Sequence, residues 1–188
     1  MPPRAGLTTE IVVETAMKIA DKEGIAQLTL FRIAEELGVR SPSLYEHVDG
    51  MEGLIKLLRL KGLKFMAREF QRAIMGVSGD EAIRRFADSF RSFVKEHPSL
   101  YSLTVESDIA DEAEIRTVAG EILDTIYAVL RIYGLSEKNL IHATRYMRSA
   151  IHGFVSLEMS AGFGLEVSLD ESFTLIKEVI VSNMKNWL

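Results

Sequence analysis

The stretch that decides the fold is residues 29–50, TLFRIAEELGVRSPSLYEHVDG. It opens with apolar residues at helical spacing. Gly38 then stands where a helix commonly ends in a residue that tolerates positive φ. A second helix start follows, with Ser41 as the expected N-cap and Pro42 at the first helical position. The pattern predicts two short helices joined by a tight turn, the second covering residues 41–47.

The second of these helices carries a polar outer face. Leu44 and Val48 are four residues apart and are expected to point inward. The residues left pointing outward are Ser41, Ser43, Tyr45, Glu46 and His47. A helix, a glycine turn and a short helix with a polar face form the helix-turn-helix plan, whose second helix enters the major groove of DNA.

Residues 9–56 resemble the DNA-binding domain of the TetR family of transcription regulators. The matching residues are the runs Ile33-Ala34-Glu35-Glu36-Leu37-Gly38-Val39, Ser43-Leu44-Tyr45, His47 and Asp49-Gly50-Met51-Glu52-Gly53-Leu54-Ile55. The resemblance implies an all-α protein of about nine helices. Its parts would be a three-helix helix-turn-helix domain in residues 1–55, a connecting helix in 51–75, and a helical ligand-binding and dimerisation domain in 78–188.

Composition agrees with a folded chain. The 188 residues are 47% hydrophobic, which is typical of globular proteins, and no apolar run is long enough to span a bilayer. The first residues lack the apolar core of a signal peptide, so a cytoplasmic protein is expected. With no cysteine there is neither a disulfide framework nor a thiolate metal site.

The net charge of −5 is unevenly spread. Residues 1–77 hold 11 Lys or Arg against 10 Asp or Glu, a balance of +1, and residues 78–188 hold 11 against 17, a balance of −6. Because Lys and Arg that neutralise phosphates supply most nonspecific affinity for DNA, +1 predicts moderate affinity for each subunit.

The candidate DNA contacts lie in and around the second helix of the motif. They are Thr29, Arg40, Ser41, Ser43, Tyr45, His47 and Lys56. Three have an alternative: Thr29 and Ser41 can serve as helix caps, and the His47 ring can pack against the next helix. Tyr45 and His47 are similar to family residues that contact the DNA backbone.

One departure from the family concerns the connecting helix. Many members carry a phosphate-contacting lysine where this chain has Met51, and Lys56 is the nearest substitute. Further cations on the same helix either extend the DNA-facing potential or form a solvated face. Arg4, in an expected flexible arm at residues 1–8, either reaches the DNA or is a charge on a disordered tail. Residues 106–114 predict a solvated acidic turn.

The second domain supplies a candidate effector pocket. Its residues are aromatic or apolar with a few polar tips, as in small-molecule sites: Phe86, Phe90, Phe93, Tyr101, Tyr127, Tyr146, Met147 and His152. The alternative for each aromatic is an ordinary core position. The segment that begins Ile151-His152-Gly153 resembles a subgroup of the family with a Trp-His-Gly signature, with Ile151 in place of tryptophan.

The last two helices are more apolar than a monomer requires. A helix that is apolar on two sides needs its own core and a second partner. In the family this helix pair forms a four-helix bundle with its mate, which implies a homodimer interface at Leu140, Ile151, Phe154, Phe173, Ile176, Ile180 and Met184. Two recognition helices would then fit half-sites about one helical turn apart.

These features predict a ligand-responsive DNA-binding regulator, a repressor that a largely apolar small molecule releases from its double-stranded DNA operator. The alternative is a helical enzyme or small-molecule carrier without specific DNA binding. No nucleophile–base pattern supports an enzyme. The four histidines show no metal-ligand spacing, and neither a cofactor nor a membrane contact is expected.

Overall fold

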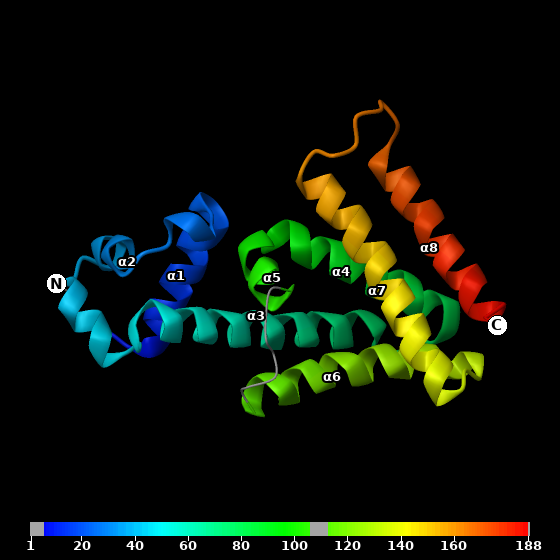
Figure 1. Ribbon diagram of the computed structural model, residues 1–188, viewed down its shortest axis with the longest axis horizontal. Helices are drawn as coiled ribbons and strands as arrows, with labels where there is room; N and C mark the ends of the chain where they lie inside the picture. The colour runs from blue at the N-terminus through cyan, green and yellow to red at the C-terminus, as the bar shows by residue number, and fades with distance from the viewer. Residues whose placement is uncertain (1–5, 106–112, 188) are drawn as a thin grey trace. The chain divides into compact units, whose positions relative to one another are not determined.

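The structure is a computed structural model that describes residues 6–105 and 113–187. Its described elements are all helices, which confirms the all-α class expected from the sequence (Figure 1). They are α1 (Thr9–Glu23), η1 (Ile25–Gln27), α2 (Leu30–Leu37), η2 (Ser41–Glu46), α3 (Gly50–Ile74), α4 (Gly79–Glu96), α5 (Pro98–Val105), α6 (Ala113–Leu130), η4 (Arg131–Tyr133), α7 (Glu137–Met159) and α8 (Leu169–Lys185). Arg4 and residues 106–112 of the expected acidic turn lie outside the described residues.

Local signals explain where α2 begins and ends. The Thr29 hydroxyl accepts a hydrogen bond from the Arg32 backbone N–H at 3.0 Å, so Thr29 is the N-cap of α2, as the sequence predicts. Gly38 has φ 65° and ψ 32°, in the left-handed region. Its N–H bonds to the Glu35 carbonyl, and a side chain at this φ would be strained.

The segment after the turn differs from the expected short α-helix. It is the 3₁₀ helix η2, Ser41–Glu46, and its N-cap is Arg40, which makes no side-chain capping bond. The prediction that Ser41 caps this helix is therefore wrong, because Ser41 already lies inside the first turn. Pro42 accordingly occupies the second position. A six-residue helix held by i→i+3 bonds, such as His47 N–H to the Leu44 carbonyl at 2.9 Å, is typical of short connecting turns.

Packing groups the described residues into two compact units. The first contains residues up to Lys64 together with Glu96–Ile115, and the second contains Phe65–Lys95 and Arg116 onward. Helix α5 thus belongs with the helix-turn-helix, although along the chain it follows the boundary expected near residue 78.

The first unit is built on one apolar core. Its buried members come from α1, α2, η2, the start of α3 and α5: Val12, Val13, Ala16, Ile19, Ala20, Leu28, Leu30, Ile33, Ala34, Leu44, Val48, Leu54, Leu58, Leu100 and Leu103. Helix α5 is also held by polar bonds, because the Ser99 hydroxyl donates to the Ala20 carbonyl at 2.6 Å and Arg59 Nε donates to the Leu103 carbonyl at 3.0 Å.

Aromatic packing and ion pairs hold the second unit. The ring of Phe70 lies 4.6 Å from that of Phe86 and 5.6 Å from that of Phe90, centroid to centroid. Helices α7 and α8 form an antiparallel hairpin joined by residues 160–168 (Figure 1). Ser136 and Ser168 are the N-caps of α7 and α8, and their hydroxyls accept hydrogen bonds from the backbone N–H groups of Asn139 and Glu171.

Candidate nucleic-acid interface

Helix η2 presents side chains to solvent from a firmly anchored base. Leu44 is fully buried and Val48 is 4% exposed, so the segment is fixed to the core. Ser43 is exposed, and Tyr45 has 63% of its surface exposed. A phenol and a small hydroxyl side chain held out from a fixed backbone can contact phosphate oxygens and base edges.

The ends of η2 carry the remaining predicted contacts of this segment. Arg40 is exposed, whereas Ser41 and His47 are half-buried. The His47 backbone carbonyl accepts a hydrogen bond from the Thr9 hydroxyl at 3.0 Å, which ties the start of α1 to the end of η2.

The other predicted DNA contacts lie at the start of α2 and on α3, and they differ in their surroundings. Thr29 is exposed at the start of α2, where its capping bond leaves a lone pair and the hydroxyl hydrogen free for a phosphate. Lys56 is exposed on α3 and lies 3.5 Å from Glu52, one turn earlier. Met51, near the start of α3, is half-buried.

Other cations of α3 are engaged within the chain. Lys61 lies 3.3 Å from Glu14, Lys64 lies 2.7 Å from Glu114, and Arg72 lies 3.3 Å from Glu69. These pairs lie at the surface, where such contacts contribute little to stability. They support a solvated, paired face for this part of α3.

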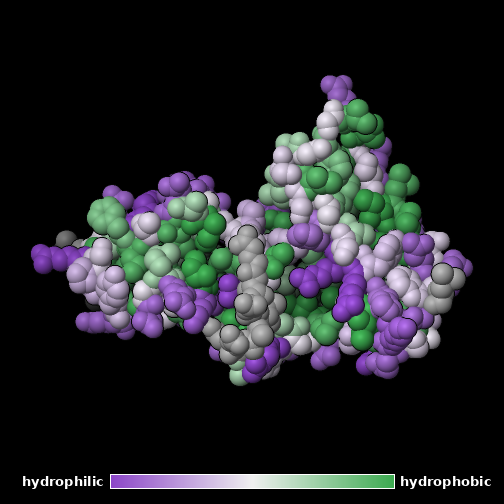
Figure 2. All heavy atoms as spheres, in the orientation of Figure 1, coloured by the Kyte–Doolittle hydropathy of each residue, from purple (hydrophilic) through white to green (hydrophobic). Residues whose placement is uncertain are grey.

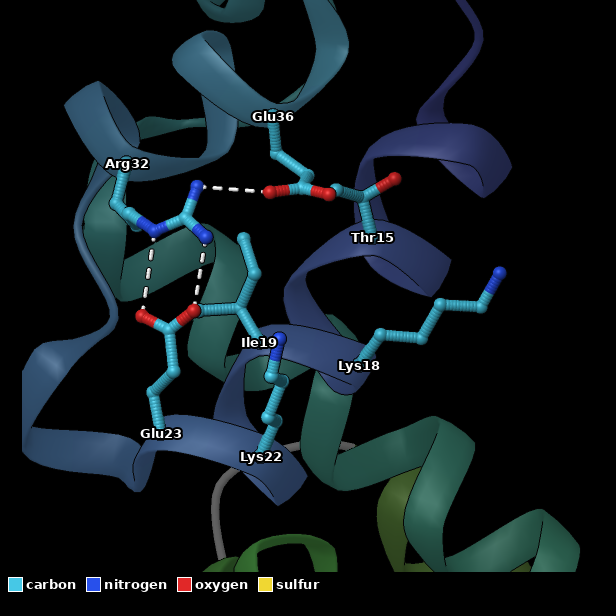
Figure 3. Close-up of a pocket in the computed structure, with 7 residues that line it drawn as sticks. All are labelled: Thr15, Lys18, Ile19, Lys22, Glu23, Arg32 and Glu36. Atoms are coloured by element: carbon cyan, nitrogen blue, oxygen red, sulfur yellow. Dashed lines mark hydrogen bonds and ion pairs between the residues drawn. The ribbon is translucent and has the colours of Figure 1, made fainter.

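A hollow of about 240 Å³ between α1 and α2 surrounds the Arg32 guanidinium (Figure 3). Arg32 Nη2 lies 2.8 Å from Glu23, and Nη1 lies 2.8 Å from Glu36. These hydrogen bonds, the one to Glu23 first, raise the pKa of Arg32, and the pKa of Glu23 is lowered in turn. The Glu23 carboxylate ties α1 to α2, the Glu36 carboxylate pairs with Arg32 within α2, and the two together neutralise the cation. Lys18 extends away from this cluster (Figure 3).

The predicted effector residues occupy several environments. Phe86 and Phe90 pack with Phe70, Phe93 packs edge-on against Phe65 at 5.6 Å, and Tyr101 is buried in the first unit. Met147 is fully buried.

The polar members of that set lie on α6 and α7. The Arg131 guanidinium carbon lies over the Tyr127 ring, 5.9 Å from its centroid. The Tyr146 hydroxyl accepts a bond of 2.6 Å from Asn183, and the half-buried His152 ring lies 3.4 Å from the Ser156 hydroxyl. Sequence reasoning missed Thr144. Its hydroxyl is buried with no hydrogen-bond partner among the described residues, a signal that only the structure provides.

Most of the predicted dimer residues face the interior of their own protomer. Leu140, Ile151, Phe154, Phe173, Ile180 and Met184 are each at most 6% exposed, and Ile176 is half-buried. The apolar surface of the hairpin is made mostly by their neighbours, and Figure 2 shows hydrophobic atoms gathered on it. A groove of about 420 Å³ there is lined by Tyr146, Ala150, Phe154, Leu157, Phe163, Leu175, Ile176 and Val179.

The described residues contain no cluster of three or more His, Cys, Asp or Glu side chains that could hold a metal ion. No helix within residues 6–105 and 113–187 is both long and apolar enough to cross a membrane.

The capped helix α2, the left-handed Gly38 and the projecting η2 define a helix-turn-helix protein. The family described as "Tetracyclin repressor-like, C-terminal domain" matches residues 83–179. The HTH-type transcriptional regulator YobS of Bacillus subtilis is 30% identical over 98% of this chain and 96% of its own length. A second regulator, from Mycobacterium tuberculosis, is 33% identical over 90% of this chain and 78% of its own. The chain belongs to the TetR family of DNA-binding transcriptional regulators.

Solved structures share the fold. A protein of unknown function from Rhodococcus sp. RHA1 aligns with a TM-score of 0.83 and 16% identity over 97% of this chain and 98% of its own. ActR of Streptomyces coelicolor, solved in complex with (S)-DNPA, aligns with a TM-score of 0.69 and 19% identity over 98% of this chain and 100% of its own.

Proposed function

We propose that the protein is a homodimeric repressor that binds an operator through η2 and leaves it when a small molecule binds the second unit. It acts in the cytoplasm by regulated binding and not by catalysis. The observation that carries the proposal is the exposed, anchored η2 within a chain of the TetR family.

The DNA-contacting surface in this proposal joins three elements. Tyr45 and Ser43 on η2 meet the duplex first, because they project from a buried anchor. Arg40 supplies a cation at the start of η2, and the exposed Thr29 hydroxyl lies where the N–H groups of a helix start favour an anion. Lys56 contributes least, because Glu52 offsets its charge.

The homodimer would form through the hairpin of α7 and α8. Of the fourteen exposed large hydrophobic side chains of the described residues, eight lie between residues 141 and 179. Leu175 is 67% exposed, Val179 54% and Leu157 48%, and all three line the same apolar groove. An exposed apolar patch of this kind marks an association surface.

The effector would bind among the helices of the second unit. A neighbour of the same fold, ActR, was solved with the small molecule (S)-DNPA, which supports a ligand role for this body. The unpartnered Thr144 hydroxyl supplies a buried polar group to which a ligand can form a hydrogen bond. The half-buried His152 lies on the same helix, α7, eight residues further along. Ile151-His152-Gly153 would place the chain beside the Trp-His-Gly subgroup. Release of DNA requires that the effector bind the two poses of the dimer with unequal affinity.

The deciding experiment selects an operator from a random duplex library with the purified wild-type protein. Affinity for the selected duplex is then measured for Tyr45→Ala and Arg40→Ala. Met75→Ala, at a 73% exposed residue just after α3, is the matched surface control. We expect each η2 variant to lose at least tenfold in affinity and the control to be unchanged. Selection of no sequence, or undiminished binding by both η2 variants, would overturn the proposal.

The dimer is tested separately by sedimentation. Leu175→Glu and Val179→Glu place charges on the exposed groove without touching the protomer core, so the expected result is a folded monomer. A wild-type protein that sediments as a monomer across micromolar concentrations would remove the dimer from the proposal.

A further inference from the structure

Phe31 is an exposed aromatic residue that does not belong to the apolar core of its own unit. It lies in the first turn of α2 and is 71% exposed, more than any other aromatic side chain among the described residues. The inner face of α2 is made by Leu30, Ile33 and Ala34, which are at most 9% exposed. The Phe31 ring therefore points away from the core that fixes its backbone.

Helix α2 has no free cation to offer to a phosphate. Its one basic residue is Arg32, and that guanidinium is held by Glu23 and Glu36 at 2.8 Å each (Figure 3). A third carboxylate, that of Glu35, lies 3.6 Å away. The first helix of a helix-turn-helix nonetheless crosses the DNA backbone, while the second helix lies in the major groove. Besides its capped N-terminus and the exposed carboxylates of Glu35 and Glu36, α2 presents a hydrocarbon ring to solvent.

We infer that Phe31 reads the operator by packing against the 5-methyl group of a thymine. The thymine methyl is the one apolar group that base pairs display in the major groove, and apolar side chains recognise it by contact. Phe31 and Tyr45 are the two most exposed aromatic residues of the described chain, and each lies on one helix of the motif. This division gives η2 the polar contacts and α2 an apolar one.

The inference rests on the DNA-binding surface proposed above and adds base discrimination to it. Removal of one buried methyl group is expected to weaken binding about fourfold for each half-site, and about fifteenfold for two. A contact with sugar or phosphate alone would show no such dependence on the methyl group.

The test replaces thymine by uracil, one position at a time, in the duplex selected by the wild-type protein. Uracil pairs as thymine does and lacks only the methyl group. We expect one thymine in each half-site to show the loss, Phe31→Ala to abolish that sensitivity, and Phe31→Leu to keep part of it. Met75→Ala, equally exposed and outside the motif, should retain the full sensitivity.

A second measurement uses the wild-type chain only. 5-Iodouracil at the sensitive position should crosslink to Phe31 on irradiation, as mapped by mass spectrometry. If no thymine is sensitive, if Phe31→Ala keeps the sensitivity, or if the crosslink maps to another residue, the inference is overturned while the regulator survives. If the wild-type protein selects no duplex, the proposed function itself fails.

Discussion

The ion pair between Arg91 on α4 and Glu158 on α7 offers a sharp test of the second unit. Arg91 Nε and Nη2 reach the two Glu158 oxygens at 2.7 and 2.6 Å, and Lys95 lies 3.0 Å away. The Arg91 and Glu158 side chains are 14% and 9% exposed. The pair is therefore mostly shielded, and it fixes the end of α7 to α4.

We predict that Glu158→Gln lowers the free energy of unfolding by about 2–3 kcal/mol at pH 7. Breaking a fully buried pair costs about 3–5 kcal/mol, and an exposed pair is worth about 0–1 kcal/mol. The estimate lies between them because the pair is near the surface and Arg91 keeps Asp170 at 2.7 Å. For a chain of this length the change corresponds to a fall of about 4–12 °C in Tm.

The assay is urea unfolding followed by circular dichroism, at one protomer concentration because a dimer's stability depends on concentration. The matched control is Glu178→Gln. Its carboxylate makes the same two-bond contact with Arg84 but is 49% exposed, so no resolved change is expected. Equal effects of the two substitutions would refute the argument from burial.

The same pair predicts a pH dependence. Hydrogen bonds from Arg91 lower the pKa of Glu158 below its ordinary 4.5, against the opposing effect of burial. A carboxylate with a lowered pKa in the folded state contributes stability above pH 4.5, and that contribution is lost as the pH falls through the folded-state pKa. The difference between wild type and Glu158→Gln should therefore narrow below pH 4.5. A difference that stays constant down to pH 3 would contradict the charge-based explanation.

Three further predictions concern backbone, caps and salt. Thr29→Ala removes the capping bond of α2 and should cost about 1 kcal/mol in urea unfolding, whereas Thr29→Ser should cost much less. Ala161 has φ 54° in the turn after α7, where a side chain is strained, so Ala161→Gly should raise the free energy of unfolding by up to about 1 kcal/mol. Gly38 has φ 65°, so Gly38→Ala should lower the free energy of unfolding by about the same amount. Arg40→Ala should reduce the slope of log affinity against log salt concentration by about 1, because this cation is expected to contact a phosphate. Titration of the selected operator at several salt concentrations measures the slope, and an unchanged slope would place Arg40 away from the DNA backbone.

The sequence by itself determined the helix-turn-helix. Thr29 starts α2 because a hydroxyl can accept a bond from a backbone N–H in the first turn, and Gly38 ends it because only glycine enters the left-handed region at little cost. The apolar spacing of Ile33, Ala34 and Leu37 predicted the inner face, on which Ile33 and Ala34 are buried and Leu37 is half-buried. These are local relations between residues a few positions apart.

Local rules were less reliable for η2. They predicted an α-helix with Ser41 as its N-cap. The chain instead forms a 3₁₀ helix that begins at Ser41 and has Arg40 as its N-cap. The signals for an α-helix and a 3₁₀ helix are nearly the same over six residues. Leu44 is buried in either case, so its inward direction did not distinguish the two kinds of helix.

Only the tertiary structure decided which surfaces remain open. A helical period shows that α7 and α8 are apolar on a face, but it does not show what covers that face. Phe173 and Ile180 therefore looked like partner contacts and are buried in their own protomer, whereas Leu175 and Val179 are exposed. The same limit applies to α5, which joins the first unit through contacts with residues about eighty positions away, such as Ser99 with Ala20. The helical period predicts the direction in which a side chain points, whereas the residue that packs against it belongs to a distant part of the sequence.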